Sequence, residues 1–398
     1  MQFIRLGACG CFIMVLLATT VLCLTAAEAA EETWSPRISL QWKYDDNINF
    51  SSRNKVRDWI YEVRPELTWR RRTERDDLRF TARLLGQKYD TESELDTLDQ
   101  DYRLEVSSQL WPTLRLSFDG SYRKDTTLDS ELREEGILLF REDRKVYRME
   151  PSVRWQATER SAWEMSIPFH QENYGGQYDD YDYKSTGTYL EYSRMLADNR
   201  TYIFVQPGFS YADFETGDTR TYQMMCGVDR AFSGRLTLRA SGGVSFSRIK
   251  EDTKTSIETG FVASVEAHGK LERGNWRARY IRDVYPGGVG TTVLRDRVTL
   301  KGMYRLSERM RFTGQTSFTD VSSQGDGGDG GDGYYGRYEY SADYWTFSIR
   351  PGLVYRLAEH ANLGIYYHHS FVDYQENDQS YRRNMFWIRL DFTTRFER

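Results

Sequence analysis

The stretch Arg235-Leu-Thr-Leu-Arg-Ala-Ser-Gly-Gly-Val-Ser-Phe-Ser247 alternates between apolar and polar side chains with a period of two. Its apolar set is Leu236, Leu238, Ala240, Val244 and Phe246, and its other set is Arg235, Thr237, Arg239, Ser241, Ser245 and Ser247. This alternation is typical of a β-strand with one face in an apolar medium and the other in water. The end of the chain repeats it, with Phe386, Ile388 and Leu390 on one face and Arg389 and Asp391 on the other.

A soluble β-sandwich would also alternate, but two features favour a membrane. The alternating segments are about 10 to 15 residues long, longer than the ~5–6 residues of most soluble strands and suited to a tilted bilayer crossing. The chain has 28 Tyr, 20 Phe and 10 Trp although 28% of it is charged, which is unlike a soluble core. Beyond residue 30 no segment approaches the ~20 apolar residues of a spanning helix, so a closed β-barrel is the structure that satisfies the backbone in lipid.

The alternation predicts eighteen strands joined by connections of alternating length. Tight turns such as Trp111-Pro112, Ser233-Gly234 and Glu272-Arg273 alternate with longer connections such as 125–143 and 322–335. Short periplasmic turns and longer extracellular loops are the outer-membrane pattern, and an even strand count puts both termini on the periplasmic side. The predicted strands lie near 36–46, 56–71, 76–90, 100–111, 113–124, 144–157, 160–174, 184–196, 200–213, 219–232, 235–249, 255–271, 274–286, 291–306, 309–321, 336–357, 361–374 and 381–397. We therefore expect an all-β fold, a transmembrane antiparallel β-barrel.

The N-terminus has the pattern of a secretory signal. Arg5 precedes an apolar stretch from Phe12 to Leu24, and Ala27-Glu28-Ala29 fits the small-x-small cleavage pattern. A transmembrane helix is the alternative, but the apolar stretch is short and ends at a cleavage site. We expect a signal peptide over 1–29, one barrel domain over 30–398, and a location in the cell outer membrane. Only one of the four cysteines, Cys226, lies outside the signal, which excludes an internal disulfide.

Barrels of ~16–18 strands leave an aqueous channel unless something plugs it, so the inward side chains are the candidate functional residues. The alternation places many arginines inward, and a basic wall concentrates anions while guanidinium groups bind carboxylate or phosphate. Our candidate lumen-lining residues are Arg79, Arg83, Arg115, Arg154, Arg239, Arg277, Arg297, Arg350 and Arg389. The alternative is that these arginines pair with inward acids such as Glu66, Asp119 and Glu266 and only keep the wall hydrated. The predicted loops are acidic, notably near 92–101 and 179–182, which disfavours a polyanion that enters from outside more than one that leaves the cell.

Aromatic residues have two possible uses. Trp59, Tyr61 and Trp69 fall on the outward face, where they would form girdles at the lipid interface. Tyr202, Phe204, Tyr366 and Trp387 fall on the inward face, where a sugar-stacking track is the alternative.

Other motifs give little support for chemistry. The tract Gly325-Asp-Gly-Gly-Asp-Gly-Gly-Asp-Gly333 offers oxygen ligands for Ca²⁺, but a single short copy is also typical of a surface loop. His368 and His369 are adjacent and so face opposite sides of a strand, and no metal-ligand spacing occurs. We find no signature of catalysis, of dinucleotide binding or of nucleic-acid binding, and expect no enzyme activity, no cofactor and no nucleic-acid partner.

The stretch Ser39-Leu-Gln-Trp-Lys-Tyr-Asp-Asp-Asn-Ile-Asn-Phe50, followed by Asp58-Trp-Ile-Tyr-Glu-Val-Arg-Pro-Glu-Leu67, resembles the opening hairpin of a family of outer-membrane β-barrel porins. Members of that family often accompany exopolysaccharide or PEP-CTERM systems. The resemblance covers about thirty residues and rests on Tyr44-Asp45-Asp46-Asn47 and on the Val-x-Pro-x-Leu pattern of the second strand. It implies an outer-membrane channel, with polysaccharide export as one specific form.

Three functional hypotheses follow. The first is a channel for passage or export of a polysaccharide or an anionic solute. The second is a general or anion-selective diffusion porin, and the third is a structural barrel that anchors a partner complex and conducts little. The expected partners are outer-membrane lipids, lipopolysaccharide and the barrel assembly machinery, with polysaccharide as a candidate cargo. Many outer-membrane barrels end in an aromatic residue that this machinery reads, whereas here Phe396 precedes Glu397 and Arg398.

Overall fold

The computed structural model describes residues 30–127, 142–175, 182–215, 217–251, 255–286, 292–323, 343–374 and 379–397. Its elements are β1 (Glu31–Asp45), β2 (Asp58–Arg72), β3 (Asp76–Tyr89), the 3₁₀ turn η1 (Ser93–Leu95), β4 (Thr97–Trp111), β5 (Leu114–Thr126), β6 (Asp143–Thr158), β7 (Ser161–Ser166), β8 (Phe169–Tyr174), β9 (Tyr183–Met195), β10 (Thr201–Phe214), β11 (Gly217–Ser233), β12 (Leu236–Glu251), β13 (Thr255–Leu271), β14 (Gly274–Pro286), β15 (Thr292–Arg305), β16 (Met310–Ser323), β17 (Tyr344–Ala358), β18 (Ala361–Tyr374), β19 (Gln379–Thr393) and β20 (Phe396–Glu397). The predicted signal peptide and the Gly/Asp tract lie outside these described residues.

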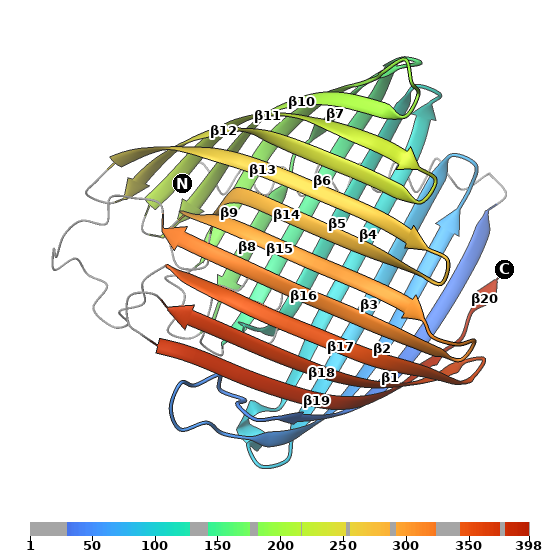
Figure 1. Ribbon diagram of the computed structural model, residues 1–398, viewed down its shortest axis with the longest axis vertical. Coiled ribbons are helices and arrows are strands. Elements are labelled where there is room, and N and C mark those ends of the chain that lie inside the picture. Colours follow the sequence, from blue (N-terminus) through green and yellow to red (C-terminus); the bar gives the residue numbers. More distant parts are fainter. Residues whose placement is uncertain are drawn as a thin grey trace.

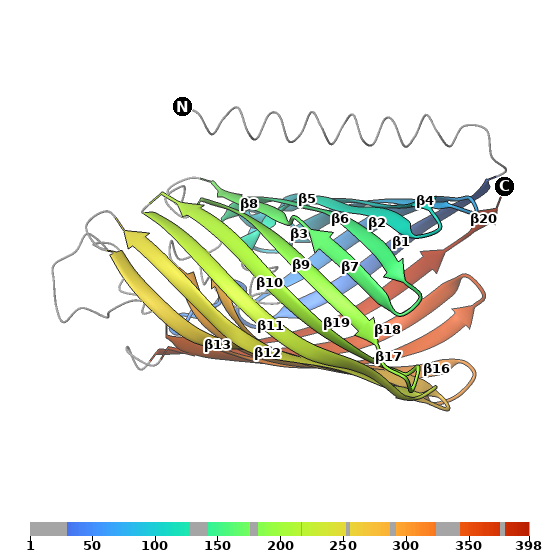
Figure 2. The ribbon, with the colours of Figure 1, turned by 90° about the horizontal axis from the view of Figure 1, so that it is seen from above.

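The strands form one closed antiparallel sheet (Figures 1 and 2). Each strand pairs with its neighbours along the chain, and β19 pairs with β1 to close the barrel, with Leu390 opposite Leu40. The strands β7 and β8 both pair with β6 and β9, so they form one crossing that is interrupted at Ile167-Pro168, where proline has no N–H to donate. The two-residue β20 prolongs β19 and pairs with β1. Within the described residues, the twenty strands therefore make eighteen crossings, which confirms the predicted strand number.

The predicted strand positions are confirmed to within a few residues at most ends. The largest difference concerns the segment near 336–357, since β17 begins at Tyr344 and residues 336–342 are not described. The other clear differences are the break between β7 and β8 and the break at 394–395 before β20. The alternation is uninterrupted across both breaks, so it could not reveal them.

The pairing register keeps one set of side chains inward around the whole barrel. Glu66 lies opposite Arg83, Arg83 opposite Asp101, and Asp101 opposite Arg123, and directly opposed residues point to the same face of a sheet. The other set is apolar and exposed, as with Trp42 and Phe261, each 57% exposed. A closed wall with paired backbone groups and an apolar outer belt is the structure that a bilayer requires. Among the described residues, no helix is long and apolar enough to cross a membrane.

The two ends of the barrel differ. At one end, which we call the turn end, tight turns join strand pairs such as β2–β3 and β11–β12. Both termini of the barrel also lie at this end, where Trp34 is opposite Phe396. The turn before β10 is closed by Asp198, whose carboxylate accepts hydrogen bonds from the backbone N–H groups of Arg200 and Thr201 at 3.1 and 3.0 Å. The hydrogen bond from the Thr201 hydroxyl, with those of the backbone, holds the pKa of Asp198 below its ordinary value. The opposite end, which we call the loop end, carries the longer connections.

Candidate functional site

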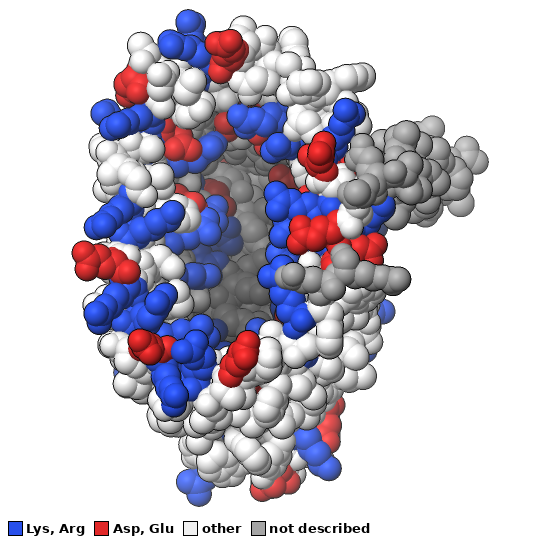
Figure 3. All heavy atoms as spheres, turned by 90° about the vertical axis from the view of Figure 1, so that its right-hand side faces the viewer, with Lys and Arg blue, Asp and Glu red and all other residues white. Residues whose placement is uncertain are grey.

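The turn end of the barrel opens into a hollow lined by many Lys and Arg side chains, with Asp and Glu between them (Figure 3). The view is from the side on which the C-terminus lies in Figure 1. The inward face of a barrel of this size is therefore strongly charged at this mouth, and the charged side chains on the strands behind it define the candidate site.

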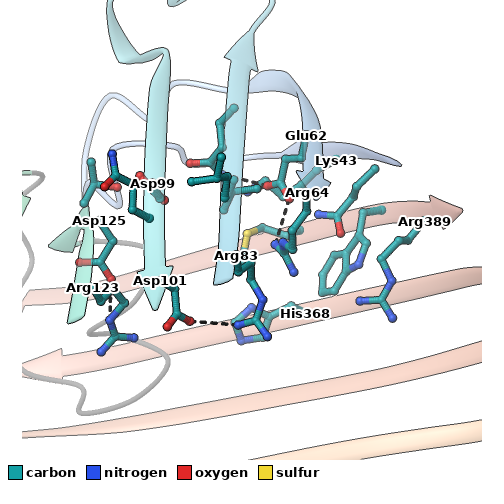
Figure 4. A pocket seen from close by; sticks show the side chains of 18 of the residues that line it. Lys43, Glu62, Arg64, Arg83, Asp99, Asp101, Arg123, Asp125, His368 and Arg389 are labelled. Atoms are coloured by element: carbon teal, nitrogen blue, oxygen red, sulfur yellow. Dashed lines mark hydrogen bonds and ion pairs between the residues drawn. The ribbon is translucent and has the colours of Figure 1, made fainter. Parts of the chain in front are cut away.

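A cavity of about 340 Å³ lies inside the wall formed by β1–β5 and β17–β19 (Figure 4). Arg83 is held on one side of it, where its Nε donates to Glu66 Oε2 at 2.8 Å and its Nη1 donates to Asp101 Oδ2 at 3.0 Å. Lys43 and Glu62 are both buried, with 2.7 Å between Nζ and Oε1. Figure 4 shows Arg123 and Asp125 on one side of this cavity and Arg389 on the other.

Two larger cavities adjoin this one. A cavity of about 560 Å³ is lined by β13–β18 and shares Arg350 with the first cavity. A cavity of about 590 Å³ is lined by β2–β6 and β8 and shares Arg83, Asp101 and Arg123 with it. Arginines thus lie at both junctions between neighbouring cavities.

All of the arginines proposed as lumen-lining occupy inward register positions. Arg83, Arg350 and Arg389 line the first cavity, Arg277 lines the second together with Arg350, and Arg79 lines the third. The remaining four line none of these three cavities. Arg115 and Arg154 lie opposite each other on β5 and β6, Arg239 lies opposite Asp229, and Arg297 lies between Ile281 and Thr319.

Many of these arginines have carboxylate partners, as the alternative interpretation expects. The distances from nitrogen to carboxylate oxygen are 2.6 to 3.8 Å for Arg79, Arg83, Arg154, Arg239, Arg277 and Arg389. Arg115 instead donates from Nε to Gln109 Oε1 at 3.0 Å. Ion pairing thus explains part of the inward arginine set.

The charge is distributed unevenly around the lumen. Within their described residues, the inward positions of β15–β18 hold no carboxylate, whereas they hold several cations: Arg295, Arg297, Lys301, Arg305, Arg311, Arg350 and Arg356. The wall formed by β9–β11 has the opposite character, because its described inward positions include Glu191 and Asp229 but no Lys or Arg. One of the acids on a neighbouring strand, Asp283 of β14, pairs with Arg295. The β15–β18 wall is therefore the strongly basic part of the lumen.

Sequence reasoning missed a group of buried ion pairs in the half nearer the loop end. Arg144 is 1% exposed and pairs with Asp125 and Glu172, in each case at 3.2 Å. Arg383 is equally buried and donates from Nε to Asp45 Oδ2 at 2.8 Å. Each of these two arginines lies an even number of residues from a predicted inward arginine on the same strand, so the alternation could have placed it in the lumen. The alternation indicates which face of the sheet a residue occupies but not how deeply its side chain is buried.

An aromatic pair also lies inside the lumen. Tyr366 and Trp387, two of the four predicted inward aromatics, stack with ring centroids 5.3 Å apart, and each is less than a tenth exposed. Phe204 is also buried and lies beneath the guanidinium group of Arg239 at 4.3 Å. Tyr202 is 40% exposed. Within the described ranges, no three His, Cys, Asp or Glu residues are grouped so that they could hold a metal ion.

Neither protein-family models nor curated proteins include a match to this chain. Solved structures with a similar fold include the outer membrane protein OpdK from Pseudomonas aeruginosa, with 9% identity, a TM-score of 0.45 and coverage of 91% of this chain and 99% of that chain. Others are OprD from Pseudomonas aeruginosa (12%, 0.46, 91% and 95%) and OccAB3 from Acinetobacter baumannii (9%, 0.44, 92% and 99%).

Proposed function

We propose that this protein is an outer-membrane channel that favours anionic solutes. The observation that supports the proposal best is the basic wall of β15–β18, whose described inward positions hold cations and no carboxylate. A wall of one sign inside a low-dielectric barrel raises the local concentration of counter-ions. Guanidinium groups also bind carboxylates and phosphates in a bidentate manner. The proposal includes a signal peptide over residues 1–29, a location in the outer membrane and a lack of enzyme activity.

Ion selectivity tests the proposal directly. The purified full-length protein would be inserted into planar bilayers, and the reversal potential would be measured across a KCl gradient. We expect a potential of the sign that chloride permeation produces. In the double variant Arg311→Glu/Arg356→Glu, which reverses two exposed inward charges, we expect the anion preference to fall or to invert, because the basic wall loses its excess charge.

A matched control is the double variant Arg273→Glu/Arg309→Glu, which makes the same change of charge in two tight turns beyond the ends of the strands. Its reversal potential should remain close to that of the parent protein. Cation preference in the parent protein, or equal shifts in both double variants, would overturn the proposal.

A second candidate is a structural barrel that conducts little. The observation that favours it is the set of fully buried ion pairs in the half nearer the loop end, including Arg144 with Glu172 and Arg383 with Asp45. Absence of measurable conductance in bilayers would support this candidate against any channel. For polysaccharide cargo, the support is the resemblance of the opening hairpin, and block of the conductance by added oligosaccharides would test it.

A further inference from the structure

The stacked pair Tyr366 and Trp387 lies against two arginines of the candidate pathway. Arg389 lies over the Tyr366 ring, 4.6 Å from its centroid, and its Nη2 donates a hydrogen bond to the Tyr366 hydroxyl at 2.6 Å. Arg350 lies on the Trp387 side, 5.9 Å from that ring's centroid. Each ring of the stacked pair thus has one guanidinium group beside it, and we call these four side chains the column.

The backbone around this column explains why Tyr366 lies where it does. Gly352 is its direct partner on β17, and a Cβ at Gly352 would lie 2.3 Å from Tyr366 Cδ1. A Cβ at Gly364 would lie 2.4 Å from Tyr366 Cε2. The ring thus occupies space that only these two glycines leave open, and it then stacks on Trp387, its direct partner on β19. Val354 and Met385 pack against the pair and complete a small apolar cluster in the inner wall.

The column also lies at a junction of cavities. Trp387 and Arg389 line the cavity of about 340 Å³, Tyr366 lines the cavity of about 560 Å³, and Arg350 lines both. A solute that moves between these two cavities therefore passes the two guanidinium groups. Arg389 has a further fixed contact, because its Nε donates to Asp391 Oδ2 at 3.0 Å, so its orientation is set from two sides.

We infer that Tyr366 and Trp387 are positioning residues that hold the guanidinium groups of Arg389 and Arg350 at this junction, where those groups set the preference of the pathway for oxyanions. The inference rests on the proposed anion channel and deepens it. An arginine side chain has several rotatable bonds, and an unrestrained one would average its charge over a large volume. Stacking on an aromatic face, together with one hydrogen bond at the hydroxyl, restrains the planar group without adding a further carboxylate. Arg389 shares the carboxylate of Asp391 with Arg37, so these three groups keep a net positive charge.

The variant Tyr366→Phe tests this inference because it removes only the hydroxyl that accepts from Arg389. We expect the ratio of anion to cation permeability, measured with potassium chloride and potassium acetate, to fall by about twofold, because the guanidinium group of Arg389 is no longer held at the junction of the two cavities. The single-channel conductance should change little, because the pore keeps its shape. Arg389→Gln should lower the same ratio further, and Tyr366→Phe should add nothing in the Arg389→Gln background, since the hydroxyl acts through that arginine.

A second variant perturbs the column without removing a polar group. Gly352→Ala places a methyl group against the Tyr366 ring and should lower the permeability ratio as Tyr366→Phe does. The matched control is Tyr202→Phe, an inward tyrosine on the wall that has no inward Lys or Arg, and it should leave the ratio unchanged. Retention of the folded mobility on unheated gels would show that each variant barrel is assembled.

The outcomes separate this inference from the proposed function. A parent protein without anion preference would overturn the proposed function and the inference together. A parent protein with anion preference that is unchanged in Tyr366→Phe, or additive effects of Tyr366→Phe and Arg389→Gln, would overturn the inference and leave the channel proposal in place.

Discussion

Arg144 and Arg154 lie on the same strand and both pair with carboxylates, but at very different depths. Arg144 is 1% exposed and contacts Asp125 and Glu172, which are themselves buried. The guanidinium group of Arg154 lies 2.9 Å from Glu164, and both side chains are more than 40% exposed. Exposed pairs contribute little to stability, whereas the loss of one partner from a buried pair leaves a charge without compensation.

The variant Arg144→Met should therefore destabilise the barrel strongly. Because two buried carboxylates lose their most deeply buried cationic partner, we expect the free energy of unfolding to fall by about 3–5 kcal/mol, with Arg123 and Arg148 as the remaining arginine partners. Urea unfolding of the detergent-refolded protein would measure it. The matched control on the same strand is Arg154→Met, for which we expect a change of less than about 1 kcal/mol. Equal effects of the two substitutions would contradict the difference in depth.

At the level of single residues, the sequence predicts the face of a side chain better than its surroundings. The period of two placed Arg83, Arg277 and Arg389 inward, and the register of the structure places them there as well. It could not show that Arg350 lies at the junction of two cavities, because that depends on how distant strands approach one another. Nor could it separate the buried Arg383 from the exposed Arg356, since both share the alternation of their strands.

At the level of elements, the first connection, residues 46–57, contacts the last strand where the barrel closes, and its sequence alone does not predict these contacts. It folds back on the last strand, where Asp46 accepts from the backbone N–H and the side-chain amide of Asn384 at 2.7 and 2.6 Å. Asn47 donates to the backbone carbonyl of Arg382 at 2.9 Å, and Phe50 stacks on Tyr381. The Tyr-Asp-Asp-Asn motif thus fastens β1 to β19, the seam that closes the barrel.

Loss of these contacts between the first connection and β19 should lower the stability of the closed barrel more than other substitutions in the same connection. Asp46→Ala removes two hydrogen bonds across the seam, and we expect a loss of about 2 kcal/mol in the free energy of unfolding. The temperature at which the folded band disappears on gels should fall accordingly. Arg53→Ala, an exposed residue of the same connection, is the control. An unchanged temperature in Asp46→Ala would show that backbone pairing alone closes the seam.

For the whole molecule, the order of turns and longer connections distinguishes the two ends of the barrel. The tight turns and both barrel termini lie at one end, and the connection of residues 46–57 lies at the other. If the barrel lies in the outer membrane with the usual orientation, the turn end faces the periplasm and the loop end faces the exterior. The acidic connection after β3, with Glu92, Glu94 and Asp96, then faces the exterior, while the basic wall lies within.

Two exposed asparagines allow a test of this orientation. Asn54 in the first connection and Asn199 in the turn before β10 both have positive φ, 53° in each case, and both are exposed. In a Cys226→Ser background, Asn54→Cys should react with a membrane-impermeant maleimide on intact cells. Asn199→Cys should react only after the outer membrane is permeabilised, because its turn faces the periplasm. Since the two sites share backbone conformation and exposure, a difference between them reports the side of the membrane, and the reverse pattern would require the barrel to be inverted.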